Sequence, residues 1–202
     1  MTLTAKPGKG GRFYLYCDEE YFAAVTAEMW YSLGVTEGQT LSAEEYDALR
    51  AEIRARQAYA SAVRMLTLRA HARRELAVKL ARKFDRDAVD YALEKCGALG
   101  FLDDAAFARE YANTLWERKR WAPGRIRQEL LAKGVSREDA EEALAGLETD
   151  AEETIRDEID RLGGVPQDKK ERQRLYAKLL RAGWSGGDIL RQFERWEDDD
   201  GC

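Results

Sequence analysis

The sequence has few of the residues that metal, redox and histidine-based catalytic sites require. Its 202 residues include one histidine, His71, and three cysteines, Cys17, Cys96 and Cys202, which are far apart in the chain. Zinc sites and disulfide frameworks need several such residues, usually in short spacings such as C-x-x-C. We therefore expect no metal site, no disulfide framework, and reduced thiols in a cytoplasmic protein.

Other signals of location and chemistry are also missing. The stretch "MTLTAKPGKGGR" at residues 1–12 has no apolar core of the kind found in signal peptides, and no apolar run is long enough to span a membrane. P-loop, G-x-S-x-G and H-E-x-x-H patterns are absent, so the sequence predicts no catalytic residues and no cofactor. "GKGG" at residues 8–11 is too short to indicate phosphate binding, and we interpret it as a flexible lead-in.

The residues that are abundant favour helices. Charged residues make up 35% of the chain and apolar residues 45%, with only three prolines. The charge is uneven along the chain. Residues 64–137 hold 17 basic and 10 acidic side chains, net +7, whereas residues 1–63 carry net −3 and residues 138–202 carry net −9. A basic centre between acidic ends indicates an anionic partner, although long solvated helices also carry many charges.

The first 57 residues differ from the rest of the chain. "RFYLYC" at residues 12–17 is rich in aromatic residues and strand-like, and "YFAAV" at residues 21–25 is its candidate hairpin partner. A helix is then predicted to begin after Ser42, which forms a capping box with Glu45. We interpret residues 1–57 as an N-terminal extension with a possible β-hairpin and a helix.

The remainder of the chain is repetitive. "LLAKGVSREDA" at residues 130–140 and "LLRAGWSGGDI" at residues 179–189 share Leu, Leu, Gly, Ser and Asp at an offset of 49 residues. "KLARKFDRDAV" at residues 79–89 is a weaker third copy, with Asp85 where Ser136 stands. A period of this length is typical of stacked repeats. The sequence predicts three three-helix repeats, at residues 58–102, 103–148 and 149–202, the last with an acidic tail.

Helix ends are clearest in the middle repeat. Pro123 suits a first helical position, Gly134 suits the left-handed residue after a helix, and Ser136 is a candidate N-cap for the next helix. Each unit can bury only part of its apolar surface alone. The predicted fold is therefore mainly α, an elongated curved stack of repeats with a small N-terminal hairpin and helix.

Adjacent carboxylates in "GFLDDAAFAREY", at residues 100–111, are the strongest candidates for chemistry. Asp103 precedes a strongly periodic helix and is suited to cap it, while Asp104 falls in the first turn, where its charge suits the helix dipole. A metal-dependent enzyme built on this pair would need further ligands, and the only histidine lies about one repeat earlier. We interpret both carboxylates as structural and expect His71 to have a surface or packing role.

Clusters of basic residues are the better candidates for binding. They can hold phosphates through their charge or meet an acidic protein surface, and the sequence does not separate these two partners. Trp121 lies at the turn before Pro123 and could bind, although packing is favoured, whereas Trp184 occupies a core position of the repeat. The candidate partner-binding residues are Arg69, Arg73, Arg74, Arg82, Lys83, Arg118, Lys119, Arg120, Arg125 and Arg127.

Residues 58–196 resemble the RecX family of regulators of the RecA recombinase. The resemblance rests on "LRAHARRELAVKL" (68–80), "GFLDDAAFAREYA" (100–112) and "GRIRQELLAKGV" (124–135), in this order and spacing. The last repeat fits more loosely. One departure is Ala72, three residues before Glu75, where the family usually has a serine. This removes half of a helix-capping box.

The resemblance implies a protein that is not an enzyme. It implies a helical stack that binds in the groove of the RecA filament on single-stranded DNA and limits filament growth, strand exchange and co-protease activity. A monomer with no membrane contact and weak direct DNA binding fits this reading. The alternative is a helical-repeat protein that binds DNA directly through its basic centre. The net charge of −9 in residues 138–202 argues against that alternative.

Overall fold

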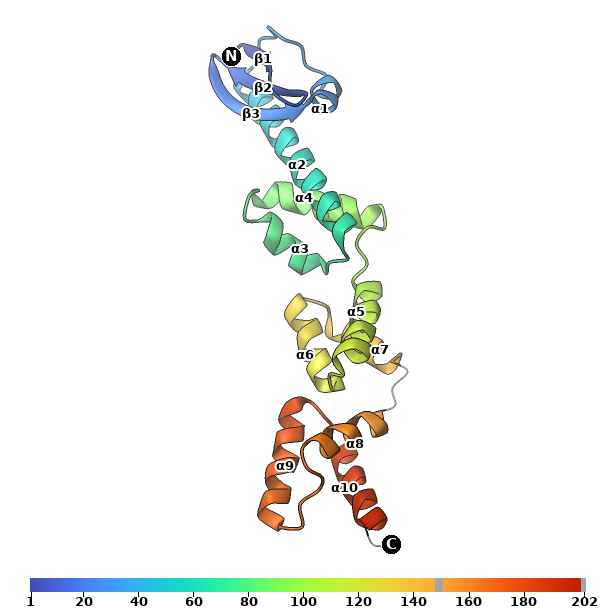
Figure 1. Ribbon diagram of the computed structural model, residues 1–202. Coiled ribbons are helices and arrows are strands. Elements are labelled where there is room, and N and C mark those ends of the chain that lie inside the picture. Colours follow the sequence, from blue (N-terminus) through green and yellow to red (C-terminus); the bar gives the residue numbers. More distant parts are fainter. Residues whose placement is uncertain (148–150, 201–202) are drawn as a thin grey trace. The chain divides into compact units, whose positions relative to one another are not determined.

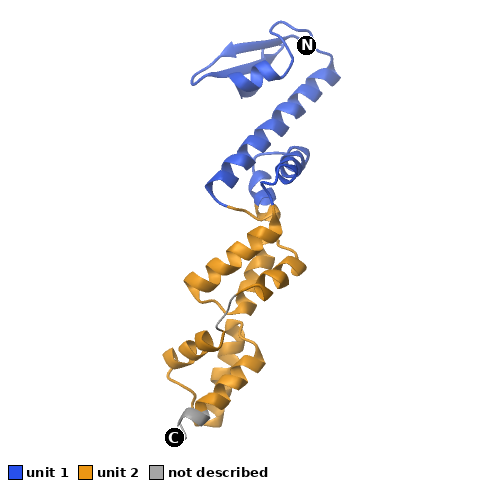
Figure 2. Ribbon diagram, turned by 90° about the vertical axis from the view of Figure 1, so that its right-hand side faces the viewer, with its two compact units in different colours: residues 1–69, 76–102 blue, residues 70–75, 103–202 orange. Residues whose placement is uncertain are grey.

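The computed structural model describes the backbone of residues 1–147 and 151–200 (Figure 1). The chain divides into two compact units, coloured separately in Figure 2. Unit 1 comprises residues 1–69 and 76–102, and unit 2 comprises residues 70–75 and 103–202. Within the described residues, no helix is long and apolar enough to cross a membrane.

A small antiparallel sheet begins the chain. Strands β1 (Leu3–Pro7), β2 (Arg12–Cys17) and β3 (Glu20–Thr26) lie in the order β1-β2-β3. The pairing of β2 with β3 confirms the predicted hairpin, but β1 was missed. The interpretation of residues 8–11 as a flexible lead-in was wrong. They connect β1 to β2, with Gly10 and Gly11 at φ of +70° and +69°, a conformation that glycine adopts without steric cost.

Two helices follow the sheet and bury one of its faces. Helix α1 (Ala27–Ser32) and the 26-residue helix α2 (Ala43–Leu68) enclose a core that includes Leu3, Leu15 and Val25. The capping box at the start of α2 is confirmed. The Glu45 backbone N–H lies 3.1 Å from the Ser42 hydroxyl, and the Ser42 N–H lies 2.7 Å from the Glu45 carboxylate.

The second half of α2 packs with α3 (Arg73–Leu80) and α4 (Arg86–Ala98). Their core includes Ala62, Leu80 and Cys96. Asp85 caps α4 by accepting a 3.0 Å hydrogen bond from the Ala88 N–H, as its repeat position indicated. Helix α2 is continuous across residues 57 and 58, so its two halves contribute to different cores of unit 1.

The middle three helices begin where the sequence predicted, and the second also ends where predicted, whereas the third ends before Leu147, which the sequence had placed on it. They are α5 (Asp104–Lys119), α6 (Pro123–Lys133) and α7 (Arg137–Ala145). Pro123 is the first residue of α6, and Gly134 ends it at φ of +91°. The Ser136 hydroxyl caps α7 by accepting a 3.0 Å hydrogen bond from the Asp139 N–H.

The last three helices follow the same order, and the end of the second and the start of the third lie 49 residues after their counterparts in the middle repeat. They are α8 (Ala151–Arg161), α9 (Lys169–Ala182) and α10 (Gly186–Asp200). Gly183 ends α9 at φ of +103°, and the Ser185 hydroxyl accepts a 3.1 Å hydrogen bond from the Asp188 N–H. Trp184 is 2% exposed, as predicted for a core position. The end of the 103–148 repeat and the start of the next include residues 148–150, which lie outside the described part of the chain.

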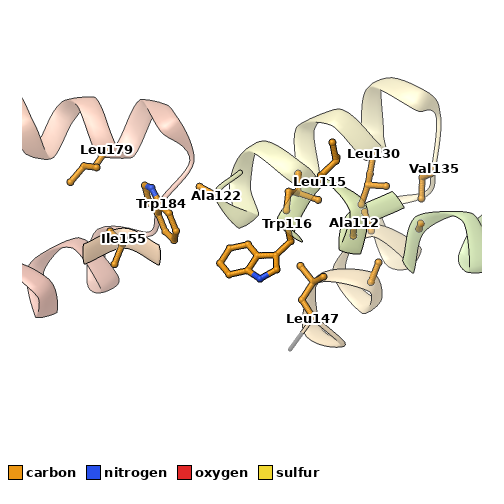
Figure 3. Packing of buried hydrophobic residues seen from close by; sticks show 14 of the residues in the cluster. Ala112, Leu115, Trp116, Ala122, Leu130, Val135, Leu147, Ile155, Leu179 and Trp184 are labelled. Atoms are coloured by element: carbon orange, nitrogen blue, oxygen red, sulfur yellow. The ribbon is translucent and has the colours of Figure 1, made fainter. Parts of the chain in front are cut away.

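One hydrophobic core joins the two repeats of unit 2 (Figure 3). Trp116 of α5 and Trp184 meet edge to face, with ring centroids 6.4 Å apart. The Gly124 N–H donates a 3.0 Å hydrogen bond to the Gly183 carbonyl. A Cβ atom at Gly124 would lie 2.5 Å from that oxygen, so the contact requires glycine. The predicted mainly α fold with helical repeats and a small N-terminal sheet is confirmed.

Candidate partner-binding site

The adjacent carboxylates lie at the starts of two helices, α5 and α3. Asp103 accepts a 2.9 Å hydrogen bond from the Ala106 N–H and is the N-cap of α5, as predicted. Asp104 accepts a 2.7 Å hydrogen bond from the Arg73 N–H at the first residue of α3. Among the described residues, no group of three or more His, Cys, Asp or Glu side chains could hold a metal ion. The geometry therefore assigns both carboxylates to helix ends.

The single histidine is part of the interior of unit 2. His71 is 5% exposed, and its Nδ1 lies 3.0 Å from a Glu75 carboxylate oxygen. The other oxygen of Glu75 lies 3.6 Å from the Lys133 ammonium. The neighbouring Ala72 is fully buried among the residues of the unit 2 core. These contacts assign His71 a packing role, one of the two that the sequence left open, and Ala72 lies in a tightly packed environment.

Four of the predicted binding residues gather at the turn from α5 to α6. We call this group the basic corner, and its members are all exposed: Arg118, Lys119, Arg120 and Arg125. The α6 N-terminus at this turn has no acidic residue in its first turn, and Ala122 makes no side-chain cap. The positive end of the helix dipole therefore adds to the cationic side chains. This turn is suited to bind an anionic surface.

Trp121 organises the basic corner. The Arg125 guanidinium carbon lies 3.9 Å from the centroid of a Trp121 ring, and the Lys119 ammonium lies 4.6 Å from it. Both distances are within the range of cation–π attraction. Trp121 is half-buried and packs against the unit 2 core, so it both packs and holds charge. The packing role is therefore confirmed, and a binding role for Trp121 stays a prediction.

Arg120 ends α5 in a conformation that rarely suits arginine. Its φ and ψ are +52° and +38°, in the left-handed region. At two other left-handed helix ends of unit 2, positions 134 and 183, the residue is glycine. A side chain in this region costs about 1 kcal/mol. The corner thus holds a guanidinium at a position where glycine would be more stable, and strain of this kind is typical of functional sites.

The other predicted residues of unit 2 have different surroundings. Arg127 faces α7, with its Nε 2.7 Å from a Glu141 carboxylate oxygen. Arg74 is exposed but lies against the end of α6, because a Cβ atom at Gly134 would be 2.3 Å from the Arg74 Cβ. Arg73 is exposed, and its N–H is held by Asp104. Arg127 and Arg74 are therefore also part of the packing between helices.

Three predicted residues belong to unit 1. Arg69 follows the last residue of α2, while Arg82 and Lys83 lie in the turn between α3 and α4, and all three are exposed. The Lys83 carbonyl accepts a 2.8 Å hydrogen bond from Arg54 of α2. The sequence grouped these residues with Arg73 and Arg74 by proximity in the chain. The two sets fall in different compact units.

Unit 1 also contains a groove that the sequence did not indicate. It has a volume of about 1400 Å³ and lies along the end of β3 and along α1, α2 and α4. Two of its cations are already paired, because Arg54 lies 3.5 Å from Asp85 and Arg56 contacts Glu52 and Ser32. Residues of both charges line it, so its electrostatics favour no particular ligand. Its lining comes from a strand and three helices that are far apart in the sequence, so local spacing could not predict it.

Comparisons with known proteins address the identity of the chain. Residues 58–96 match a family model described as the first three-helix domain of RecX, and residues 103–144 match one described as the second. The chain is 34% identical over 149 residues to the regulatory protein RecX of Cronobacter sakazakii, which covers 67% of this chain and 90% of that protein. The chain belongs to the RecX family. A RecX of Escherichia coli is 35% identical over 150 residues, and the RecX of Caldanaerobacter subterraneus, at 26% identity, covers 96% of both chains.

Solved RecX structures share the fold. A crystal structure of regulatory protein RecX superposes with a TM-score of 0.70 and 21% identity, covering 96% of this chain and 97% of that one. RecX from Lactobacillus salivarius gives a TM-score of 0.61 and covers 71% of this chain. The basic corner and both helix-capping aspartates lie in or beside the second RecX domain. The relatives are named as regulatory proteins, and that is the general class of this RecX family member.

Proposed function

We propose that this chain regulates the RecA recombinase by docking on the RecA filament formed on single-stranded DNA. In this proposal it binds as a monomer in the filament groove and limits filament growth, strand exchange and co-protease activity. It acts by occupying surface and catalyses no reaction. Membership of a family named as regulatory proteins supports the general role.

The basic corner is the observation that carries the placement of the contact. Four exposed cations lie at one turn, and two of them contact Trp121. The first turn of α6, which begins there, contains no acidic residue. Preorganised cations lose less side-chain entropy on binding than free ones. Such a surface is complementary to an acidic protein surface or to the phosphates that a filament exposes. The exposed Arg69, Arg73, Arg82 and Lys83 supply further weak contacts, which add through avidity when several are made together.

Charge reversal at the corner tests this placement. Arg118→Glu and Arg125→Glu together should sharply reduce inhibition of RecA strand exchange and co-sedimentation with preformed RecA–DNA filaments. Both residues are exposed, so the free energy of unfolding should fall by no more than the lost Arg125–Trp121 contact, about 0.5–1 kcal/mol. Arg137→Glu is the matched control, since Arg137 is an exposed arginine of the same unit at the start of α7, outside the corner. Full inhibition by the corner variant, or equal loss in the control, would contradict the placement.

Direct DNA binding is the second candidate. The net charge of +7 in residues 64–137 suits a polyanion, and so does the Arg125 guanidinium held over the Trp121 ring. The net charge of −9 in residues 138–202 opposes it. Filament docking requires much tighter binding to RecA-coated DNA than to bare DNA of the same length. Equal affinity for the two would support the DNA-binding alternative.

A further inference from the structure

The N-terminal sheet has one face that the rest of unit 1 does not cover. Alternate residues of β1 and β2, including Leu3, Ala5 and Leu15, are buried on the face toward α1 and α2. Because side chains alternate along a strand, the residues between them belong to the opposite face. That opposite face carries Thr4, Lys6, Tyr14 and Tyr16, and these are half-buried or exposed.

Tyr21 of β3 joins this face through an irregularity in the sheet. The register of β2 with β3 shifts between Leu15 and Tyr16, so that Leu15 pairs with Ala23 while Tyr16 pairs with Tyr21. A bulge of this kind changes the direction in which the following side chains point. Tyr21 is 54% exposed, and its ring meets those of Tyr16 and Tyr14 edge to face at 5.8 Å and 6.4 Å. We call these three residues the tyrosine face.

Neighbouring groups contact the rings of the tyrosine face, and cationic side chains lie near them. The Lys6 ammonium lies 4.7 Å from the centroid of Tyr16. A Cβ atom at Gly8 would lie 2.4 Å from the Tyr14 ring, so the backbone of the β1–β2 turn lies against that ring. Lys9 and Arg12 are exposed at the same end of the sheet. The acidic residues Asp18, Glu19 and Glu20 lie at the other end of β2 from Arg12, next to Tyr16 and Tyr21, so the positive border is on the Tyr14 side of the face.

We infer that the tyrosine face binds single-stranded DNA. Proteins bind single strands by stacking bases on aromatic rings and by holding the phosphates with a positively charged border. Tyr14 and Tyr16 supply rings two residues apart on one strand, and Lys6, Lys9 and Arg12 supply the border. An apolar peptide would use the rings but gain little from this cationic end, and duplex DNA hides its base faces. Neither family model covers residues 1–57, so this site is separate from the RecX domains and from the basic corner.

Site-directed variants of the full chain test the face. The probe is a fluorescein-labelled 16-nucleotide oligothymidine, with binding followed by anisotropy. Tyr14→Ala should weaken binding by about 5-fold to 100-fold, and Tyr16→Ala by a similar factor, which are the usual effects of losing one stacking ring. Tyr14→Phe should keep most of the affinity because it keeps the ring. Tyr31→Ala is the control, since Tyr31 is 77% exposed on α1, away from the face.

A second measurement locates the contact in the unaltered protein. Oligothymidine containing 5-bromodeoxyuridine should photocrosslink to peptides that contain Tyr14, Tyr16 or Tyr21. Crosslinks confined to the basic corner, or equal losses of affinity for Tyr31→Ala and Tyr14→Ala, would overturn the inference. Tighter binding of oligouridine than of oligothymidine, or of duplex than of single strand, would also overturn it. Because the Arg118 and Arg125 variants leave this face intact, failure of this site is distinguishable from failure of the filament proposal.

Discussion

At the scale of single residues, two neighbouring aspartates have different partners. The sequence predicted Asp103 as an N-cap because the cap, the first turn and the apolar stripe of α5 are all local. The bond from the Arg73 N–H to Asp104 joins residues 31 positions apart. No local pattern predicts such a contact, because it depends on how α3 and α5 begin in the folded unit. The same holds for Lys133 and Glu75.

Substitutions at the two aspartates distinguish their structural roles from chemistry. Asp103→Ala should lower the free energy of unfolding by about 0.5–2 kcal/mol, and Asp103→Asn by less, because asparagine also caps helices. Asp104→Ala should also destabilise, by about 1 kcal/mol, since the Arg73 N–H loses its acceptor. Urea titrations would measure both. A catalytic or metal-binding role would instead require Asp103→Asn to abolish the proposed inhibition of RecA while stability stays unchanged.

At the scale of helices and strands, the ends of elements were the most predictable feature. Pro123, Gly134, Ser136 and Ser42 all have the roles that their residue types favour. Strand β1 was missed because "LTAKP" is short and its pairing with β2 depends on a glycine turn. The basic corner was predicted as a set of charges. The sequence did not predict that Trp121 contacts Arg125 or that Arg127 pairs with Glu141. Both contacts depend on how α5, α6 and α7 pack together.

The glycine contact between the repeats of unit 2 can be tested directly. Gly124→Ala would place a Cβ atom 2.5 Å from the Gly183 carbonyl oxygen, so backbone must move. Overpacking of this kind costs about 1–3 kcal/mol. Gly187→Ala is the control, because its Cβ atom would contact only flexible side-chain atoms at 3.8 Å or more. Alanine should be neutral or stabilising at that helical position. Equal unfolding midpoints for the two variants would contradict this account.

The cap of α4 should make unit 1 sensitive to acid. The hydrogen bond from the Ala88 N–H, with a smaller contribution from Arg54, lowers the pKa of the Asp85 carboxyl below its ordinary value. A carboxyl whose pKa is lower in the folded state stabilises the fold above its unfolded pKa, about 3.9, and this contribution is lost as the pH falls through the folded pKa. The free-energy difference between wild type and Asp85→Asn should therefore shrink from pH 6 to pH 3 at constant salt. A difference that grows on acidification would show that the carboxylate is not stabilised by folding.

At the scale of the whole molecule, the central segment carries a charge opposite in sign to the net charge of the chain. The chain carries −5 overall, yet residues 64–137 carry +7. This segment contains all ten proposed binding residues, and the structure divides them between two units. An anionic partner that responded only to the net charge of the chain would be repelled. Recognition must therefore be local, through groups such as the basic corner, and it weakens once salt screens interactions beyond about 8–10 Å.

The salt dependence of the DNA-binding constant measures how many of these cations contact phosphates. If only the basic corner contacts bare duplex DNA, about four phosphates are neutralised, and the slope of log K against log salt should be near −4. Arg120→Gly should make this slope less steep by about one, because it removes one cation. It should also raise stability, since glycine adopts φ of +52° without the cost that arginine bears. Arg137→Gln, which changes an exposed cation outside the corner, should leave the slope unchanged. A slope near −8, or one that both variants alter equally, would mean that the basic residues act together as a diffuse field and that the corner is no distinct site.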